Sequence, residues 1–85
     1  METYFFEMTD TFAGEANYCW VRRVLVRATS LRGACIKAAR HFGVSGRIRK
    51  AYDAGDLARW DVRNAAICVF ASPAECGEGY DLETI

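Results

Sequence analysis

The pattern of apolar and polar residues along the chain predicts one helix among several strands. Thr3–Met8 alternates between an aromatic-rich face and a more polar one, which is typical of a strand. Tyr18–Thr29 is rich in Val, Trp and Tyr and predicts a long second strand. Asp10–Asn17 contains turn-forming residues. We therefore expect the two strands to form a β-hairpin with a long exposed loop.

The segment after this hairpin has the period of an amphipathic helix. An apolar stripe recurs at helical spacing at Leu31, Cys35, Ala38 and Phe42. Ser30 is a suitable N-cap, and Gly43 is a suitable residue to end the helix. The sequence therefore predicts a helix over Leu31–Phe42.

The remainder of the chain returns to strand patterns. Arg47–Tyr52 and Leu57–Arg63 alternate on either side of a turn at Asp53–Asp56. After a second turn at Asn64, Ala65–Ala71 is apolar on both faces, which favours a central strand. Residues 74–85 are acidic and have little pattern, so we expect either a flexible acidic tail or a short terminal element.

These elements predict a single α+β domain over residues 1–85. Its element order would be β-β-α-β-β-β, with a mostly antiparallel sheet of four to five strands and one helix packed on a face. No apolar run approaches the roughly 18 residues of a membrane span, and the N-terminus has no basic signal region. We therefore expect a soluble cytoplasmic protein that does not associate with membranes.

Charge is strongly sorted along the chain although its net value is zero. Residues 1–21 carry four acids and no base, whereas residues 22–50 carry nine bases and no acid. Residues 51–85 carry seven acids and two bases. Such sorting needs an explanation, because it leaves a basic middle block between two acidic ends.

Three interpretations of this sorting stay open. Opposite charges can pair across neighbouring strands and neutralise one another. The basic block can instead form a surface for phosphate. The third interpretation is a protein-binding surface built from charged loops together with Arg, Trp and Tyr, which are common at binding hot spots. The residues that we expect in it are Asp10, Glu15, Trp20, Arg22, Arg23, Tyr52, Asp53, Asp56 and Trp60.

The residue types typical of catalysis and of metal binding are sparse. The four cysteines, Cys19, Cys35, Cys68 and Cys76, form no C-x-x-C pair and have no zinc-ligand spacing, so we expect reduced thiols, no metal and no cofactor. The single histidine, His41, lies six residues after Cys35, roughly 220–240° around the helix from it. We therefore expect no catalytic residues and no enzyme.

Three segments, residues 10–23, 30–34 and 52–56, resemble the short proteins carried by phages and mobile elements. That class includes many anti-CRISPR proteins. The resemblance implies a non-enzymatic inhibitor that binds a host protein complex, such as a Cas effector, and blocks it by occlusion. The alternatives are a small nucleic-acid-binding accessory protein that uses the basic block, and a structural subunit that self-associates.

Overall fold

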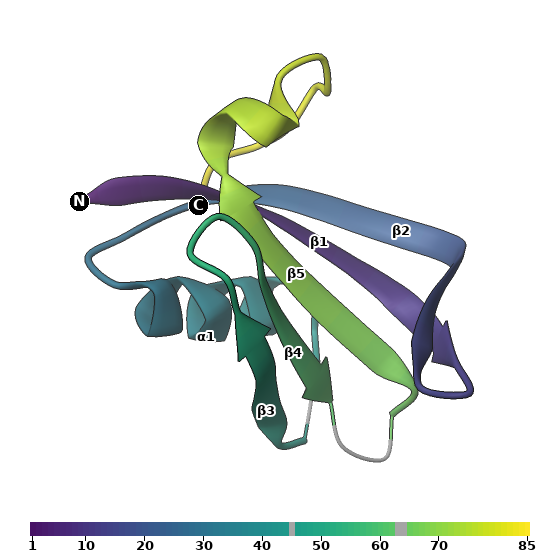
Figure 1. Cartoon of the computed structure of the whole chain (residues 1–85). Helices are drawn as coiled ribbons and strands as arrows, with labels where there is room; N and C mark the ends of the chain where they lie inside the picture. Colours follow the sequence, from purple (N-terminus) through teal and green to yellow (C-terminus); the bar gives the residue numbers. More distant parts are fainter. Residues whose placement is uncertain (45, 63–64) are drawn as a thin grey trace.

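The computed structural model describes residues 1–44, 46–62 and 65–85 and contains one sheet and one α-helix (Figure 1). The strands are β1 (Glu2–Phe12), β2 (Glu15–Ala28), β3 (Ile48–Asp53), β4 (Ala58–Val62) and β5 (Ile67–Pro73). The helix α1 spans Leu31–His41, and a 3₁₀ helix, η1, spans Ala74–Gly77. The α+β class and the predicted element order are confirmed. Arg63 and Asn64, the predicted end of a strand and the predicted turn after it, lie outside the described residues.

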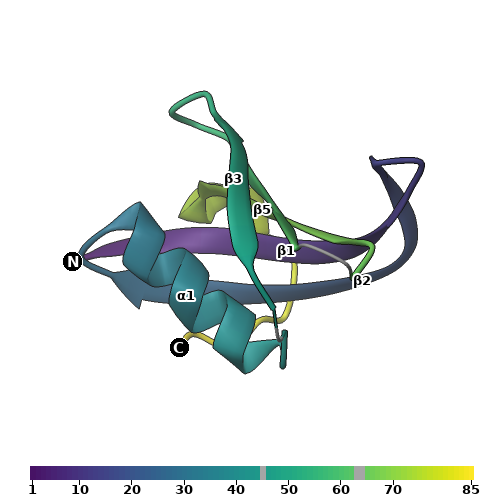
Figure 2. The same ribbon diagram turned by 90° about the horizontal axis from the view of Figure 1, so that it is seen from below.

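All five strands are antiparallel to their neighbours, in the order β2-β1-β5-β4-β3. The two longest strands form a hairpin that extends beyond the helix (Figures 1 and 2). β5, which is apolar on both faces, lies between β1 and β4 as its sequence predicted. The sheet therefore has only two edges, at β2 and at β3.

The helix packs on one face of the sheet, against β1 and β2 (Figure 2). The predicted N-cap, Ser30, is confirmed, because its Oγ accepts a hydrogen bond from the Gly33 backbone N–H at 3.0 Å. Ala34, Cys35 and Ala38 are its buried residues in the main core. They meet an apolar layer contributed by the four strands β1, β2, β4 and β5, which consists of Phe6, Met8, Val24, Val26, Ala58, Trp60, Val69 and Ala71.

Two bulges change which side chains share a face. In β3, Lys50 lies opposite Trp60 but Tyr52 lies opposite Arg59, so Ala51 is an extra residue. This bulge moves Tyr52 to the face away from the helix. In β2, residues 17–20 all lie opposite one residue of β1, Asp10.

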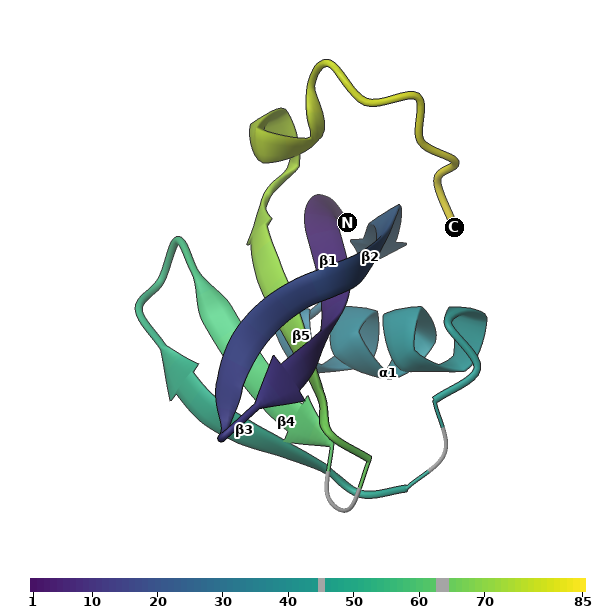
Figure 3. The ribbon, with the colours of Figure 1, turned by 90° about the vertical axis from the view of Figure 1, so that its right-hand side faces the viewer.

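The C-terminal segment packs on the sheet, on the side away from α1 (Figures 1 and 3). Gly77 is buried against Phe5 and Leu25. The last residues then run beside the outer edge of β2, where Leu25 and Arg27 donate backbone hydrogen bonds to the carbonyls of Glu83 and Ile85. Residues 74–85 thus form a terminal element that covers the end of β2 at one of the two sheet edges.

Candidate functional site

The sheet face opposite α1 is here called the open face, although the terminal segment covers the part of it around Phe5 through Gly77 and Tyr80. This face carries one side chain from every strand in a single line. The strand registers place Tyr52 opposite Arg59, Arg59 opposite Phe70, Phe70 opposite Glu7, and Glu7 opposite Arg23. We call these five residues the cross-sheet row. Because residues directly opposite each other on neighbouring strands lie about 5 Å apart, the row crosses the whole width of the sheet.

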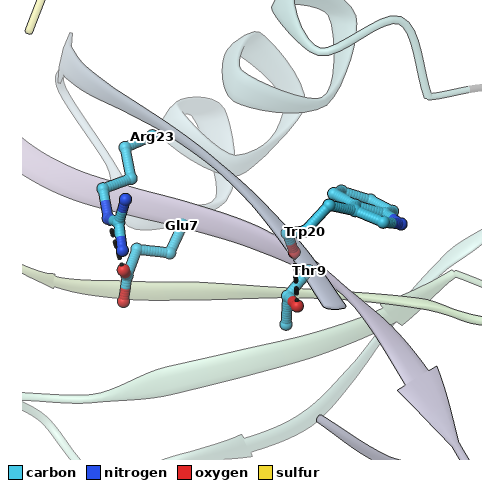
Figure 4. A network of polar contacts seen from close by, with 4 residues as sticks. All are labelled: Glu7, Thr9, Trp20 and Arg23. Atoms are coloured by element: carbon cyan, nitrogen blue, oxygen red, sulfur yellow. Dashed lines mark hydrogen bonds and ion pairs between the residues drawn. The ribbon is translucent and has the colours of Figure 1, made fainter. Parts of the chain in front are cut away.

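Ion pairs and ring contacts hold the two arginines of the row. Arg23 Nε donates to Glu7 Oε2 at 2.8 Å (Figure 4), and its guanidinium lies 4.4 Å from the centre of the Tyr80 ring. Arg59 Nε donates to Asp61 Oδ1 at 2.9 Å, and its guanidinium lies 5.6 Å from the Phe70 ring centre. Both guanidinium groups are therefore held in place and largely neutralised by a carboxylate.

Arg59 also ties the tip of the long hairpin to the open face. Its Nη2 donates to the carbonyl oxygen of Gly14 at 2.7 Å, and only 16% of its side chain is exposed. The side chains that perturb the pKa of Tyr18 all belong to this face, and they are Glu7, Cys68, Tyr52 and Arg59. Partial burial, followed by the charge of Glu7, raises the pKa of Tyr18, so its phenol stays neutral.

The hairpin end presents further aromatic side chains. Phe12 is 75% exposed, Tyr18 is 57% exposed and Trp20 is 40% exposed. The backbone there is held by buried Thr9, whose Oγ1 donates to the Trp20 carbonyl at 2.8 Å, while the indole points away from Thr9 (Figure 4). Large rings exposed on a fixed backbone are typical of a binding surface.

The nine residues predicted for the site are distributed over three regions. Arg23 and Tyr52 belong to the cross-sheet row, although three strands separate them. Arg22 and Trp60 lie on the helix side, and Trp60 is only 5% exposed because its ring stacks on Phe6 at 6.0 Å. Trp60 is thus largely part of the core.

The other predicted residues lie in turns and at strand ends. Asp10 accepts hydrogen bonds within the β1–β2 bulge, and Glu15 is exposed at the start of β2, opposite Phe12. Asp53 accepts from the Gly55 backbone N–H at 3.0 Å and pairs with Lys50, so it stabilises its own turn. Asp56, also in that turn, is exposed.

Sequence reasoning missed Glu7, Arg59, Phe70 and Tyr80. Glu7 and Arg23 carried a usable signal, because the pairing of an acidic first strand with a basic second strand was expected. Arg59 and Phe70 meet only through the β4–β5 register, and Tyr80 meets Arg23 only because the terminal segment folds back.

Packing and contacts with the terminal segment account for the positions of Cys35 and His41. Burial raises the pKa of Cys35 to about 11, which keeps this thiol protonated and poorly nucleophilic. His41 Nε2 lies 2.9 Å from Glu83 Oε1, which links the helix to the terminal segment. Among the described residues, no three His, Cys, Asp or Glu side chains are placed to hold a metal ion.

No helix in the described part of the chain is long and apolar enough to cross a membrane. Comparison of the chain with protein families, with curated proteins and with solved structures found no match.

Proposed function

We propose that this protein is a non-enzymatic binding protein that attaches to a folded protein partner through the cross-sheet row and acts by occluding part of that partner. The row is the observation that supports this proposal. It combines Tyr, Phe and Arg, residues that contribute much of the energy at protein interfaces. Two pairs of its side chains, Glu7 with Arg23 and Arg59 with Phe70, are already held by contact, so ordering them on binding costs little side-chain entropy.

Charge balance on the open face favours a protein partner over nucleic acid. Arg23 and Arg59 are each paired with a carboxylate, Glu7 and Asp61, at 2.8 and 2.9 Å. These carboxylates would repel a phosphate backbone, whereas a protein surface of mixed charge can match them. The exposed ring of Tyr18, which lies near Glu7 and Arg59, extends the same surface along the hairpin.

The proposed partner class is a bacterial defence complex such as a Cas effector, as the resemblance to anti-CRISPR proteins implies. The test expresses the chain in bacterial strains that each carry one CRISPR–Cas type and are challenged with a phage targeted by that system. Restored plaque formation in one strain would support the proposal. Full immunity in every strain would overturn the assignment to CRISPR inhibition.

Variants then test whether the row is the surface used. We expect Arg23→Ala and Tyr52→Ala each to weaken binding to the purified effector by about tenfold or more, measured by biolayer interferometry. Arg22→Ala is the matched control, because Arg22 is the sequence neighbour of Arg23 but faces the helix side. An equal loss for Arg22→Ala and Arg23→Ala would contradict the role of the row.

A further inference from the structure

A groove of about 390 Å³ lies between α1 and strand β3 on the helix side of the sheet. Its apolar part contains Ile36 and Ile48, and Ile36 is 42% exposed. Its charged residues are both cations, Arg32 from the helix and Lys50 from the strand. Among the described residues the lining is Arg32, Cys35, Ile36, Ile48, Lys50 and Trp60. Lys50 Nζ also pairs with Asp53 Oδ2 at 3.3 Å, which leaves Arg32 as the cation of the groove that faces no carboxylate in its lining.

The groove lies beside an edge strand. β3 is the last strand in the sheet order, and its residues are almost all exposed. At the opposite edge, the terminal segment covers the end of β2 through backbone hydrogen bonds to Leu25 and Arg27. An edge strand presents a row of backbone N–H and C=O groups to any extended chain that lies alongside it.

Cations also occur on the other side of this edge. A second hollow, of about 610 Å³, is lined by Arg47, Ile48, Arg49 and Asp61, and it shares Ile48 with the groove. Side chains of an added strand alternate between the two faces of the sheet. Acidic side chains would therefore meet Arg32 and Lys50 on one face and Arg49 on the other. These three cations outnumber the two carboxylates beside them, Asp53 next to Lys50 and Asp61 opposite Arg49.

We propose that the outer edge of β3 and the groove beside it bind an extended acidic segment of a partner protein by β-strand addition. The segment pairs its backbone with β3, and an aliphatic side chain packs between Ile36 and Ile48. Carboxylates on the same face reach Arg32 and Lys50. The groove lies on the face opposite the cross-sheet row, and the two surfaces adjoin at β3, which contributes Tyr52 to the row.

The chemistry of the groove favours a peptide over a nucleic acid. Bases bind single-strand sites by stacking on accessible aromatic rings. The aromatic ring here, that of Trp60, is 5% exposed, and the Lys50 ammonium lies above it at 5.9 Å from the ring centre. Aliphatic walls beside an unpaired strand edge are instead typical of sites that recognise peptides by strand addition.

The test selects peptides from a display library of random sequences about eight residues long, which can span β3. We expect the selected peptides to be enriched in Asp and Glu together with aliphatic residues. Against the doubly reversed variant Arg32→Glu/Lys50→Glu, the selection should shift to basic peptides. Peptides without acidic excess, or the same peptides selected by the variant, would overturn the proposal.

Two further measurements use the best selected peptide. The backbone amides of the peptide form two alternating sets, and only one set faces β3. N-methylation of the set that faces β3 should weaken binding by about tenfold. Equal binding of both methylated sets would overturn strand addition. If an oligothymidylate bound more tightly than the peptide and lost binding in the reversed variant, the site would be assigned to nucleic acid.

Arg23→Ala is the control for this site, because Arg23 lies on the open face. This variant should bind the peptide with an affinity within about twofold of the wild-type value. It should bind the partner of the cross-sheet row more weakly. Loss of peptide binding in this variant would place the peptide on the open face and contradict the proposal. Melting temperatures of all variants check that the exposed substitutions leave the fold intact.

Discussion

Asp10 organises the widest irregularity of the sheet with one carboxylate. It accepts hydrogen bonds from Asn17 Nδ2 and from the Cys19 backbone N–H, both at 2.9 Å. Between these donors, Tyr18 has φ of +55°, in the left-handed region that non-glycine residues rarely adopt. The two bonds therefore hold the conformation that directs Tyr18 over the open face.

Acid should weaken this arrangement. The hydrogen bond from Asn17, followed by that from Cys19, lowers the pKa of Asp10 below the ordinary aspartate value. A carboxylate with a lowered folded-state pKa stabilises the fold above its unfolded pKa, and this stabilisation is lost as pH falls through the folded value. We expect the stability difference between the wild-type protein and Asp10→Asn to be largest near neutral pH and to shrink below about pH 4.

Urea unfolding at several pH values measures this difference. Asp56→Asn is the control, because this exposed aspartate lies in the β3–β4 turn, away from the bulge. A stability gap for Asp10→Asn that stays constant down to about pH 3 would show that the carboxylate charge is not involved.

At the scale of elements, alternation predicted the order and type of every strand and the helix with its Ser30 cap. It placed the end of the first strand at Met8, whereas β1 continues to Phe12. Thr9 and Asp10 resemble a loop in the sequence, but Thr9 is buried and bonded to the Trp20 carbonyl. A polar residue satisfied by a distant partner cannot be distinguished from a loop residue by its local pattern.

The bulges explain why the candidate site was only partly predictable. Strict alternation would place Lys50 and Tyr52 on the same face, but Ala51 moves Tyr52 to the face of Arg59. The nine predicted residues were chosen by type and by loop position, so they include Trp60, which packs in the core. The row itself depends on four strand registers, and these are set by the fold as a whole.

The terminal element is held by close packing at Gly77. A Cβ atom placed there would lie 2.9 Å from Phe5 Cδ1 and 3.2 Å from both Leu25 Cδ2 and Leu82 Cδ1. We expect Gly77→Ala to destabilise the protein by about 1–3 kcal/mol in urea unfolding, because the segment must shift off the sheet. Backbone amide exchange of Leu25 and Arg27, which donate to this segment, should accelerate in the variant.

Glu78→Ala is the matched control for this prediction, because Glu78 is the next residue and is exposed. Its stability should stay within about 0.5 kcal/mol of the wild-type value. If Gly77→Ala were as stable as Glu78→Ala, the packing of the terminal element at Gly77 would not contribute measurably to the free energy of unfolding.

For the whole molecule, the fold separates the charges that the sequence had sorted. Part of the basic block is neutralised on the open face, as in the Arg23–Glu7 pair. Another part gathers along α1 and β3, where Arg32 and Lys50 line a groove and Lys50 also pairs with Asp53. A neutral chain thus acquires one surface of paired charges and one groove with an excess of cations, on opposite sides of the same sheet.

These two sides share a core, and the cysteines can report whether it opens as one unit. Cys35 lies on the helix side and Cys68 on the open-face side; both are buried, and burial raises both thiol pKa values, that of Cys35 to about 11. Cys19 and Cys76 are exposed. We expect two thiols to react rapidly with a disulfide reagent near pH 8, and two to react only when the protein unfolds.

The variant Cys19→Ala/Cys76→Ala isolates the two buried thiols. A small domain with one core unfolds in a single cooperative step, so Cys35 and Cys68 should react at the same rate, equal to the rate limited by global opening. Mass spectrometry of partly labelled protein should then show unlabelled and doubly labelled molecules with few intermediates. Faster labelling of Cys35 would instead mean that α1 leaves the sheet while the strands stay paired. The groove between α1 and β3 would then be a mobile site, and binding of a peptide there should slow the labelling of Cys35 alone.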